Sequence, residues 1–293
     1  MGMLTKQHSL SAVAEALEIS ASGYHTHVGK SRRPRRQQDA QLRKVLAECF
    51  AASRQTYGSP RLLRDLRERG FACGNNRVNR LMRETGLRPR QKRRFRPKTT
   101  DSRDTKKPAP NWLDRVPAPD RPGQIWQSDF TYIPTGEGWL YLAFTLDAFS
   151  RRCVAHHCRE DMAVDLVTAT LRQALARATP PPGLIHHSDR GSQYAAEAFQ
   201  ARLRAARITP SMSRCGNPYD NALAESFVAT LKTECLGHCI PATRSAARLL
   251  IFDYIEAFYN PRRRHSSLDF RSPVDAESSV EPPVPHPRTN HKN

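Results

Sequence analysis

The strongest constraint on the fold is a change of sequence pattern at Ile125. The chain before this point is polar and basic, whereas from here three strand-like segments follow one another. They are IWQSDFTYIP (125–134), WLYLAFTLDAF (139–149) and RRCVAHHC (151–158). Helix and strand patterns then alternate, with helices over 163–178, 195–206, 219–235 and 244–258 and short strands over 183–189 and 208–213. This order predicts an α/β fold, a mixed sheet covered by helices.

The charge of the chain is concentrated in one segment. Of the formal net charge of +19, residues 30–107 carry 25 basic against seven acidic residues. Such a segment predicts a polyanionic partner. A mean hydropathy of −0.66 and the absence of any run of 18 apolar residues argue against a membrane span. The N-terminus has no apolar core of the signal-peptide kind, and seven cysteines without a Cys-x-x-Cys pair indicate reduced thiols, so we expect a cytoplasmic protein.

Residues 57–87 predict a helix pair. Ser59 and Pro60 resemble a helix cap and first turn, and Asn75 or Asn76 can cap a second helix. Leucines at 62, 63 and 66, and apolar residues at 78, 81 and 82, give each helix one apolar face. On the other face of the second helix stand three arginines, Arg77, Arg80 and Arg83. Such a pair suits a helix-turn-helix motif that binds DNA, although an arginine-rich solvated helix is the plainer alternative.

The segments that flank this helix pair carry less information. Residues 9–29 predict two short helices that are too small to fold alone. Residues 88–123 hold seven prolines and the basic run RPRQKRRFRPK, so we interpret them as an extended linker that buries little.

Three acidic residues stand out by their surroundings. Asp129 interrupts the apolar run of the first strand, where a carboxylate is costly unless a cation compensates it. Asp189 follows the short strand GLIHHSD, at the edge where open α/β sheets bind ligands. Glu225, 35 residues further on, shares a helix face with Lys232. Oxygen ligands of this kind suit Mg²⁺ or Mn²⁺, and two such ions can clamp both oxygens of a phosphodiester exchange.

Four segments in this order resemble the catalytic core of bacterial insertion-sequence transposases, specifically the second-frame product of the two-frame class. They are WQSDFTYIPTGEGWLYLAFTLDAFSRR, HHSDRGSQY, SMSRCGNPYDNALAESFVATLKTE and AFYNPRRRHSSLDFRSPVDAE. The resemblance covers about residues 57–276. It implies the D,D-35-E arrangement of retroviral integrases on an RNase H-like fold.

The resemblance also implies roles for individual residues. Asp129, Asp189 and Glu225 match the metal-binding catalytic triad, with two Mg²⁺ (or Mn²⁺) ions as cofactors. Lys232 matches a basic residue that contacts element-end DNA. Cys215 stands where the family often has a basic residue, and Pro218 replaces a more flexible position; these departures affect DNA contacts and loop geometry.

Other chemistries fit the sequence less well. The groups Cys235–His238–Cys239 and His156–His157–Cys158 lack a four-ligand zinc spacing. His186 and His187 are expected as strand-end residues, with His187 near the metal site. The basic run at 262–265 lacks the remaining pattern of a tyrosine recombinase and suits phosphate contact or a structural role. No Gly-x-x-x-x-Gly-Lys loop implies nucleotide hydrolysis.

The sequence therefore predicts a DNA transposase subunit that cleaves and joins element ends with metal ions. A non-catalytic DNA-binding regulator of transposition is the main alternative, and a simple nuclease is a third. Double-stranded DNA, further copies of the chain and a first-frame partner with a helix-turn-helix and leucine zipper are the expected partners. We expect four regions: a helix-turn-helix region (1–87), a linker (88–123), an RNase H-like core with a C-terminal helix (124–276) and a disordered tail (277–293).

Overall fold

A computed structural model describes residues 15–16, 32–90, 109–214, 218–237 and 239–280. The chain divides into two compact units, Met1–Pro89 and Arg90–Asn293. The short helices expected over 9–29 lie almost entirely outside the described residues. No helix among the described residues is long and apolar enough to cross a membrane.

The first unit is a cluster of three helices. They are α3 (Arg32–Ala52), α4 (Ser59–Glu68) and α5 (Asn75–Glu84). The expected helix pair is α4 and α5, and α3 packs on both. Its core consists of completely or nearly completely buried side chains from all three helices: Leu42, Leu46, Cys49, Phe50, Leu62, Leu63, Leu66, Val78, Leu81 and Met82.

The caps expected for α4 and α5 are wrong by one residue. Gly58 and Gly74 are the N-cap residues, both extended and without a side-chain cap. Their carbonyl oxygens accept the first helical hydrogen bonds, from Leu62 N at 3.1 Å and from Val78 N at 3.2 Å. Ser59 and Asn75 are therefore already inside the helices. Pro60 lies in the first turn as expected, where its missing N–H costs nothing.

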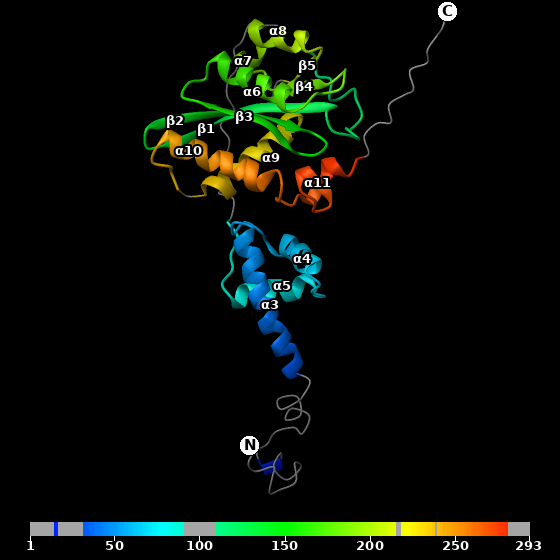
Figure 1. The fold of residues 1–293 in the computed structure, drawn as a ribbon, viewed down its shortest axis with the longest axis vertical. Coiled ribbons are helices and arrows are strands. Elements are labelled where there is room, and N and C mark those ends of the chain that lie inside the picture. Colours follow the sequence, from blue (N-terminus) through cyan, green and yellow to red (C-terminus); the bar gives the residue numbers. More distant parts are fainter. Residues whose placement is uncertain (1–14, 17–31, 91–108, 215–217, 238, 281–293) are drawn as a thin grey trace, which may run out of the picture. The chain divides into compact units, whose positions relative to one another are not determined.

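The second unit contains a five-stranded mixed sheet in the order β3-β2-β1-β4-β5 (Figure 1). β1 pairs antiparallel with β2, which pairs antiparallel with β3, whereas β4 lies parallel to both β1 and β5. The strands span β1 Ile125–Thr135, β2 Gly138–Asp147, β3 Cys153–Arg159, β4 Ile185–Ser188 and β5 Thr209–Met212. The predicted mixed sheet is confirmed.

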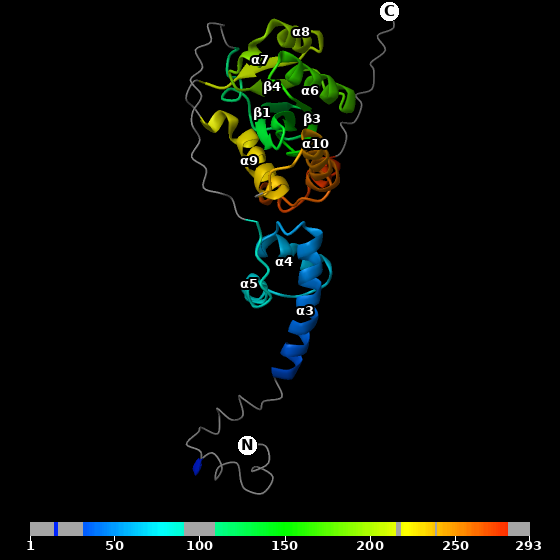
Figure 2. The same ribbon diagram turned by 90° about the vertical axis from the view of Figure 1, so that its left-hand side faces the viewer.

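Helices cover both faces of this sheet (Figures 1 and 2). One layer consists of α6 (Val164–Arg177), α7 (Ser192–Ala195) and α8 (Glu197–Ala205). The other contains α9 (Ala222–Leu231) and α10 (Arg244–Phe252), and α11 (Pro273–Ser278) follows at its end. The first layer seals Trp126 and Phe199 in its core. In the second layer Phe227 of α9 packs 4.6 Å from Phe144 of the sheet, between ring centroids.

The two long helices expected near the C-terminus, 219–235 and 244–258, are present as continuous helical runs in which the type of helix changes along the chain. A 3-10 turn (Pro218–Asn221) precedes α9, and a π-helical turn (Lys232–Leu236) ends it. A second π-helical turn, Asp253–Tyr259, continues α10. A short 3-10 helix, Ser266–Leu268, precedes α11.

Two segments at the borders of this unit are more ordered than the sequence suggests. The expected linker lies partly outside the described residues, but from Ala109 it packs on the core, and Trp112 N donates to Ser211 Oγ at 2.9 Å. Of the expected tail, residues 281–293 also lie outside the description. Glu277, however, belongs to α11 and pairs with Arg152 at 2.7 Å.

Candidate active site

Asp129 and Asp189 lie side by side where the pairing of β1 with β4 ends. In the parallel pair β1–β4, Ser128 is opposite Ser188, and each aspartate is the next residue along its strand. The carboxyl ends of neighbouring parallel strands form the usual ligand-binding edge of an α/β sheet. The pairing of β1 with β4 thus brings together two acids that are 60 residues apart in the sequence.

Each carboxyl group is held by hydrogen bonds from its surroundings. Asp129 Oδ1 accepts from Phe130 N at 2.7 Å, and Asp129 Oδ2 accepts from Asn221 Nδ2 at 2.9 Å. Asp189 Oδ1 accepts from Gly191 N at 3.0 Å. A Cβ on Gly191 would lie 3.0 Å from that same oxygen, so the absence of a side chain allows the loop to fold tightly around the carboxylate.

The electrostatics of the pair are unfavourable without a cation. Burial, followed by the charge of Asp189 and to a smaller extent that of Glu225, raises the pKa of Asp129 to about 7, against the hydrogen bonds from Phe130 and Asn221. Burial also raises the pKa of Asp189. A divalent cation between two such groups would restore their ionised forms, which is why this arrangement suits a metal site.

Glu225 stands apart from the aspartate pair. It lies in the first turn of α9 and is exposed, and it acts on Asp129 through its charge. Within the part of the chain that the structure describes, no three His, Cys, Asp or Glu side chains are grouped so that they could hold a metal ion. The structure therefore brings two of the three predicted ligands together and leaves the third beside them.

Lys232 faces the same region. Its ammonium nitrogen lies 4.8 Å from the centre of the Tyr132 ring, a cation–π contact. Burial lowers its pKa, and the charge of Asp129 opposes that change. Lys232 is thus within electrostatic range of the Asp129 carboxyl group.

The donor set fits a hard divalent cation. Its donors are the two carboxylate groups. Two further buried oxygen atoms, Asn221 Oδ1 and Gln127 Oε1, have no hydrogen-bond partner within the described part of the chain. Gln127 lies on the same face of β1 as Asp129, since side chains alternate along a strand. Mg²⁺ and Mn²⁺ prefer such oxygen ligands.

His186 and His187 are structural. His187 is completely buried, and its two ring nitrogens lie 2.8 Å from Ser211 Oγ and 3.0 Å from Ser213 Oγ. Burial lowers the pKa of His187 to about 4 and that of His186 to about 3. Both rings are occupied inside the sheet, so the expectation of strand-end residues describes them better than that of ligands.

The remaining histidine and basic clusters also have local partners. His156 Nε2 lies 3.1 Å from Glu256 Oε1. Arg263 forms a bidentate ion pair with Glu234, with both side chains less than 8% exposed. His238 lies outside the described residues, but Cys235 Sγ donates to a main-chain oxygen of α10. Of the two roles expected for the basic run, Arg263 has the structural one.

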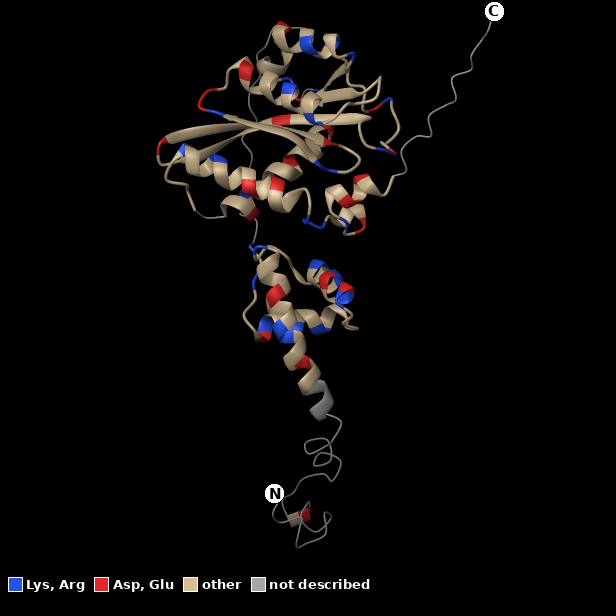
Figure 3. Ribbon diagram, viewed as in Figure 1, with Lys and Arg blue, Asp and Glu red and all other residues tan. Residues whose placement is uncertain are grey.

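The predicted arginine stripe of the helical unit is only partly available to DNA. Asp39 of α3 pairs with Arg77 at 2.6 Å and with Arg80 at 2.7 Å, and Arg80 also pairs with Glu84. Figure 3 shows acidic residues interspersed with basic ones across these helices. Arg83 is exposed. The arginine stripe is predicted from the residues of α5 alone. Its carboxylate partner, Asp39, comes from α3, a helix that the sequence does not predict.

Both units match models of known protein families. An HTH-like domain matches residues 37–95, and two integrase core domain models match residues 119–218 and 206–273. The simian T-cell lymphotropic virus intasome aligns at 16% identity and a TM-score of 0.47, covering 85% of this chain and 80% of that chain. The fold and these matches define an integrase core preceded by a helix-turn-helix-like domain, as the sequence predicted.

Relatives of nearly full length narrow the family. The chain is 42% identical over 262 residues to the insertion element IS600 uncharacterized 31 kDa protein of Shigella sonnei, covering 89% of this chain and 96% of that protein. It is 40% identical to the transposase for insertion sequence element IS904 of Lactococcus lactis (84% and 98% covered). Transposase InsF for insertion sequence IS3A of Escherichia coli is 35% identical (93% and 95% covered). The chain belongs to this family of insertion-sequence transposases.

Proposed function

We propose that this chain is a transposase subunit that cuts the ends of its insertion element and joins them to target DNA. The observation that carries the proposal is the placement of Asp129 and Asp189 side by side, each directly after the residues that pair β1 with β4. Their raised pKa values indicate a site that needs a cation. Family membership supports a polynucleotidyl transferase activity on double-stranded DNA.

Each residue has a role in this proposal. Asp129 and Asp189 would hold the metal ions, and Glu225 would complete the ligand set from the first turn of α9. Two bound ions would supply an activated oxygen nucleophile and stabilise the departing oxygen. Lys232, beside Tyr132, would bind a phosphate of the element end. In the helical unit, Arg83 is the best placed of the three predicted arginines for DNA, because Arg77 and Arg80 pair with Asp39.

Joining two element ends calls for more than one copy of the chain. We therefore propose a homo-oligomer, with a first-frame helix-turn-helix and leucine-zipper protein as a further partner. The helical unit and the basic segment would anchor the complex to DNA, while the core performs the reaction.

The test is an incubation of purified full-length protein with a supercoiled plasmid that carries the element ends. Wild type, Asp189→Asn and, as a matched control, Asp161→Asn are compared with and without Mg²⁺. Asp161 is exposed and paired with Arg159, outside the candidate site. We expect metal-dependent cuts at fixed positions and joined products for wild type and control, and neither for Asp189→Asn.

Other outcomes decide between the alternatives. Equal cutting by Asp189→Asn would refute the assignment of the carboxylate pair. Cutting without joined products would indicate a nuclease. DNA binding without any reaction, even after the first-frame partner is supplied, would indicate a regulator of transposition.

A further inference from the structure

Asn221 uses its side chain in an unusual way for its position. It is the N-cap residue of α9, where an asparagine side chain ordinarily accepts a hydrogen bond from the first turn. Here the side chain makes no such cap. Its Nδ2 instead donates to Asp129 Oδ2 at 2.9 Å, over a separation of 92 residues. The start of α9 is thereby joined directly to the strand that carries Asp129.

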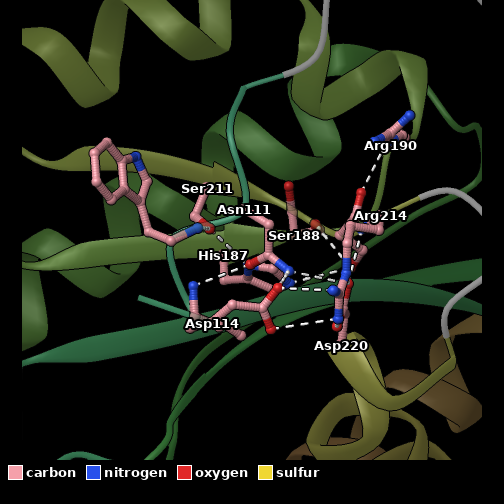
Figure 4. Close-up of polar contacts among 11 residues, drawn as sticks. Asn111, Asp114, His187, Ser188, Arg190, Ser211, Arg214 and Asp220 are labelled. Carbon is pink, nitrogen blue, oxygen red and sulfur yellow. Dashed lines mark hydrogen bonds and ion pairs between the residues drawn. The ribbon is translucent and has the colours of Figure 1, made fainter. Parts of the chain in front are cut away.

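The preceding residue, Asp220, is the centre of a polar network, which we call the Asp220 anchor (Figure 4). Asp220 Oδ2 accepts from Arg214 N at 2.8 Å and from Asn111 Nδ2 at 3.0 Å. Its Oδ1 accepts from the Arg214 guanidinium at 3.1 Å. With its side chain only 5% exposed, Asp220 is fixed from the end of β5 and from the segment that leads into the core.

The Asp220 anchor is itself connected to β5 and the residues that follow it. Trp112, next to Asn111, donates its main-chain N–H to Ser211 Oγ of β5, and His187 Nδ1 lies 2.8 Å from the same hydroxyl oxygen. Arg190 Nε donates to the Ser213 carbonyl at 2.7 Å, which fixes the loop after Asp189 to the same strand end. Both aspartates of the pair are thus connected to the end of β5. Asp189 is connected through Arg190 of its own loop, and Asp129 through Asn221 and the neighbouring Asp220.

We propose that Asn221 and Asp220 are positioning residues for the carboxylate pair. Asn221 orients the Asp129 carboxyl group for a metal ion, and the Asp220 anchor holds Asn221 and the first turn of α9, which carries Glu225, at the correct distance. This inference rests on the proposed function. It assigns no ligand role to either residue.

The expected effect follows from how carboxylate ligands behave. A carboxyl group that rotates freely must be ordered again when a cation binds, so removal of an orienting hydrogen bond weakens metal binding. Loss of such outer partners typically reduces metal affinity about 10- to 100-fold. A residue that only fastens a loop would instead change unfolding and leave the metal affinity of the folded protein unchanged.

The experiment measures Mn²⁺ affinity of the full-length chain by titration with electron paramagnetic resonance, alongside the thermal unfolding midpoint. Asn221→Ala removes the amide without removing a helix cap, and Asp220→Asn keeps the shape but loses the charge paired with Arg214. Asp114→Asn is the matched control, because Asp114 pairs with the same Arg214 at 2.9 Å but is 46% exposed and is linked to Asp220 only through Arg214 and Asn111 among the contacts described. Asp129→Asn reports binding at the pair itself.

We expect Asn221→Ala to bind Mn²⁺ about 10- to 100-fold more weakly, Asp220→Asn to shift in the same direction, and Asp114→Asn to bind as wild type. If Asp129→Asn loses binding while Asn221→Ala and Asp220→Asn retain it, the positioning roles are refuted and the proposed metal site stands. If Asp129→Asn binds as wild type, the metal site is refuted together with the inference.

Discussion

Replacing Asp129 by asparagine should stabilise the metal-free protein at neutral and alkaline pH. The substitution keeps the shape of the side chain and its ability to accept from Phe130 N. It removes a charge that burial and the neighbouring Asp189 make costly. Sites built to hold a cation commonly carry such a cost in their empty state.

The size of the effect follows from the pKa of Asp129. That pKa rises from an ordinary 3.8 in the unfolded chain to about 7 in the folded protein. Between these values the folded state keeps a proton that the unfolded state has released, so the free energy of unfolding falls as the pH rises from about 4 to about 7. A shift of about three units corresponds to a ceiling of about 4 kcal/mol. Of this ceiling we expect roughly half, because the site relaxes and admits water when the carboxyl group ionises.

The assay is urea unfolding in the presence of a chelator, at pH 5 and pH 8 and at one ionic strength. The stability of Asp129→Asn relative to wild type should increase by about 1–2 kcal/mol between the two pH values. Titrating groups that do not interact with Asp129 cancel in this difference. A gap that stays constant, or that shrinks as the pH rises, would refute the electrostatic reasoning. Adding Mg²⁺ at pH 8 should stabilise wild type and not the variant.

Four further predictions concern the rest of the chain. Arg263→Ala should lower the free energy of unfolding by about 3–5 kcal/mol, because it leaves the Glu234 carboxylate buried without its ion-pair partner; urea unfolding measures this. Phe144→Ala, at a completely buried position between sheet and α9, should cost about 3–5 kcal/mol in the same assay. Asp39→Asn should strengthen DNA binding at low salt, measured by fluorescence anisotropy, since Arg77 and Arg80 lose the Asp39 carboxylate, although Arg80 keeps Glu84. If about eight phosphates are neutralised, DNA affinity should fall roughly 10⁴-fold between 50 and 200 mM salt, and a flat response would contradict the charge argument.

The sheet could be predicted because its strands carry strong local patterns. The alternation in 125–134 and the apolar run in 139–149 correspond to β1 and β2. Asp129 was recognisable as an acid inside an apolar strand, and Asp189 as an acid at a strand end. Helix α3 is absent from the sequence prediction, although its buried residues Leu42, Leu46 and Cys49 repeat at helical spacing. The many basic residues around them obscure this apolar pattern.

The parts that sequence reasoning missed depend on contacts between distant residues. Asn221 donates across 92 residues, and Asn111 reaches Asp220 across 109. No local pattern signals such a contact, and an Asp-Asn pair before a helix indicates only a cap. The two π-helical turns are also joined by such a contact, since Tyr254 of the second donates to Glu234 of the first at 2.7 Å across 20 residues.

The strand order also has a consequence for how the chain assembles. The β1–β2 and β2–β3 pairings join sequence neighbours, so this half of the sheet can form early, whereas β4 must return past α6 to reach β1. Until it arrives, β1 presents an open edge to other chains, which is a liability during synthesis. The two aspartates meet only in the β1–β4 pairing, which joins residues 60 positions apart, more than any other strand pairing of this sheet. Their repulsion therefore opposes that long-range pairing and not the local β1–β2 and β2–β3 pairings, and a nascent chain that ends before Ile185 has no carboxylate pair at all.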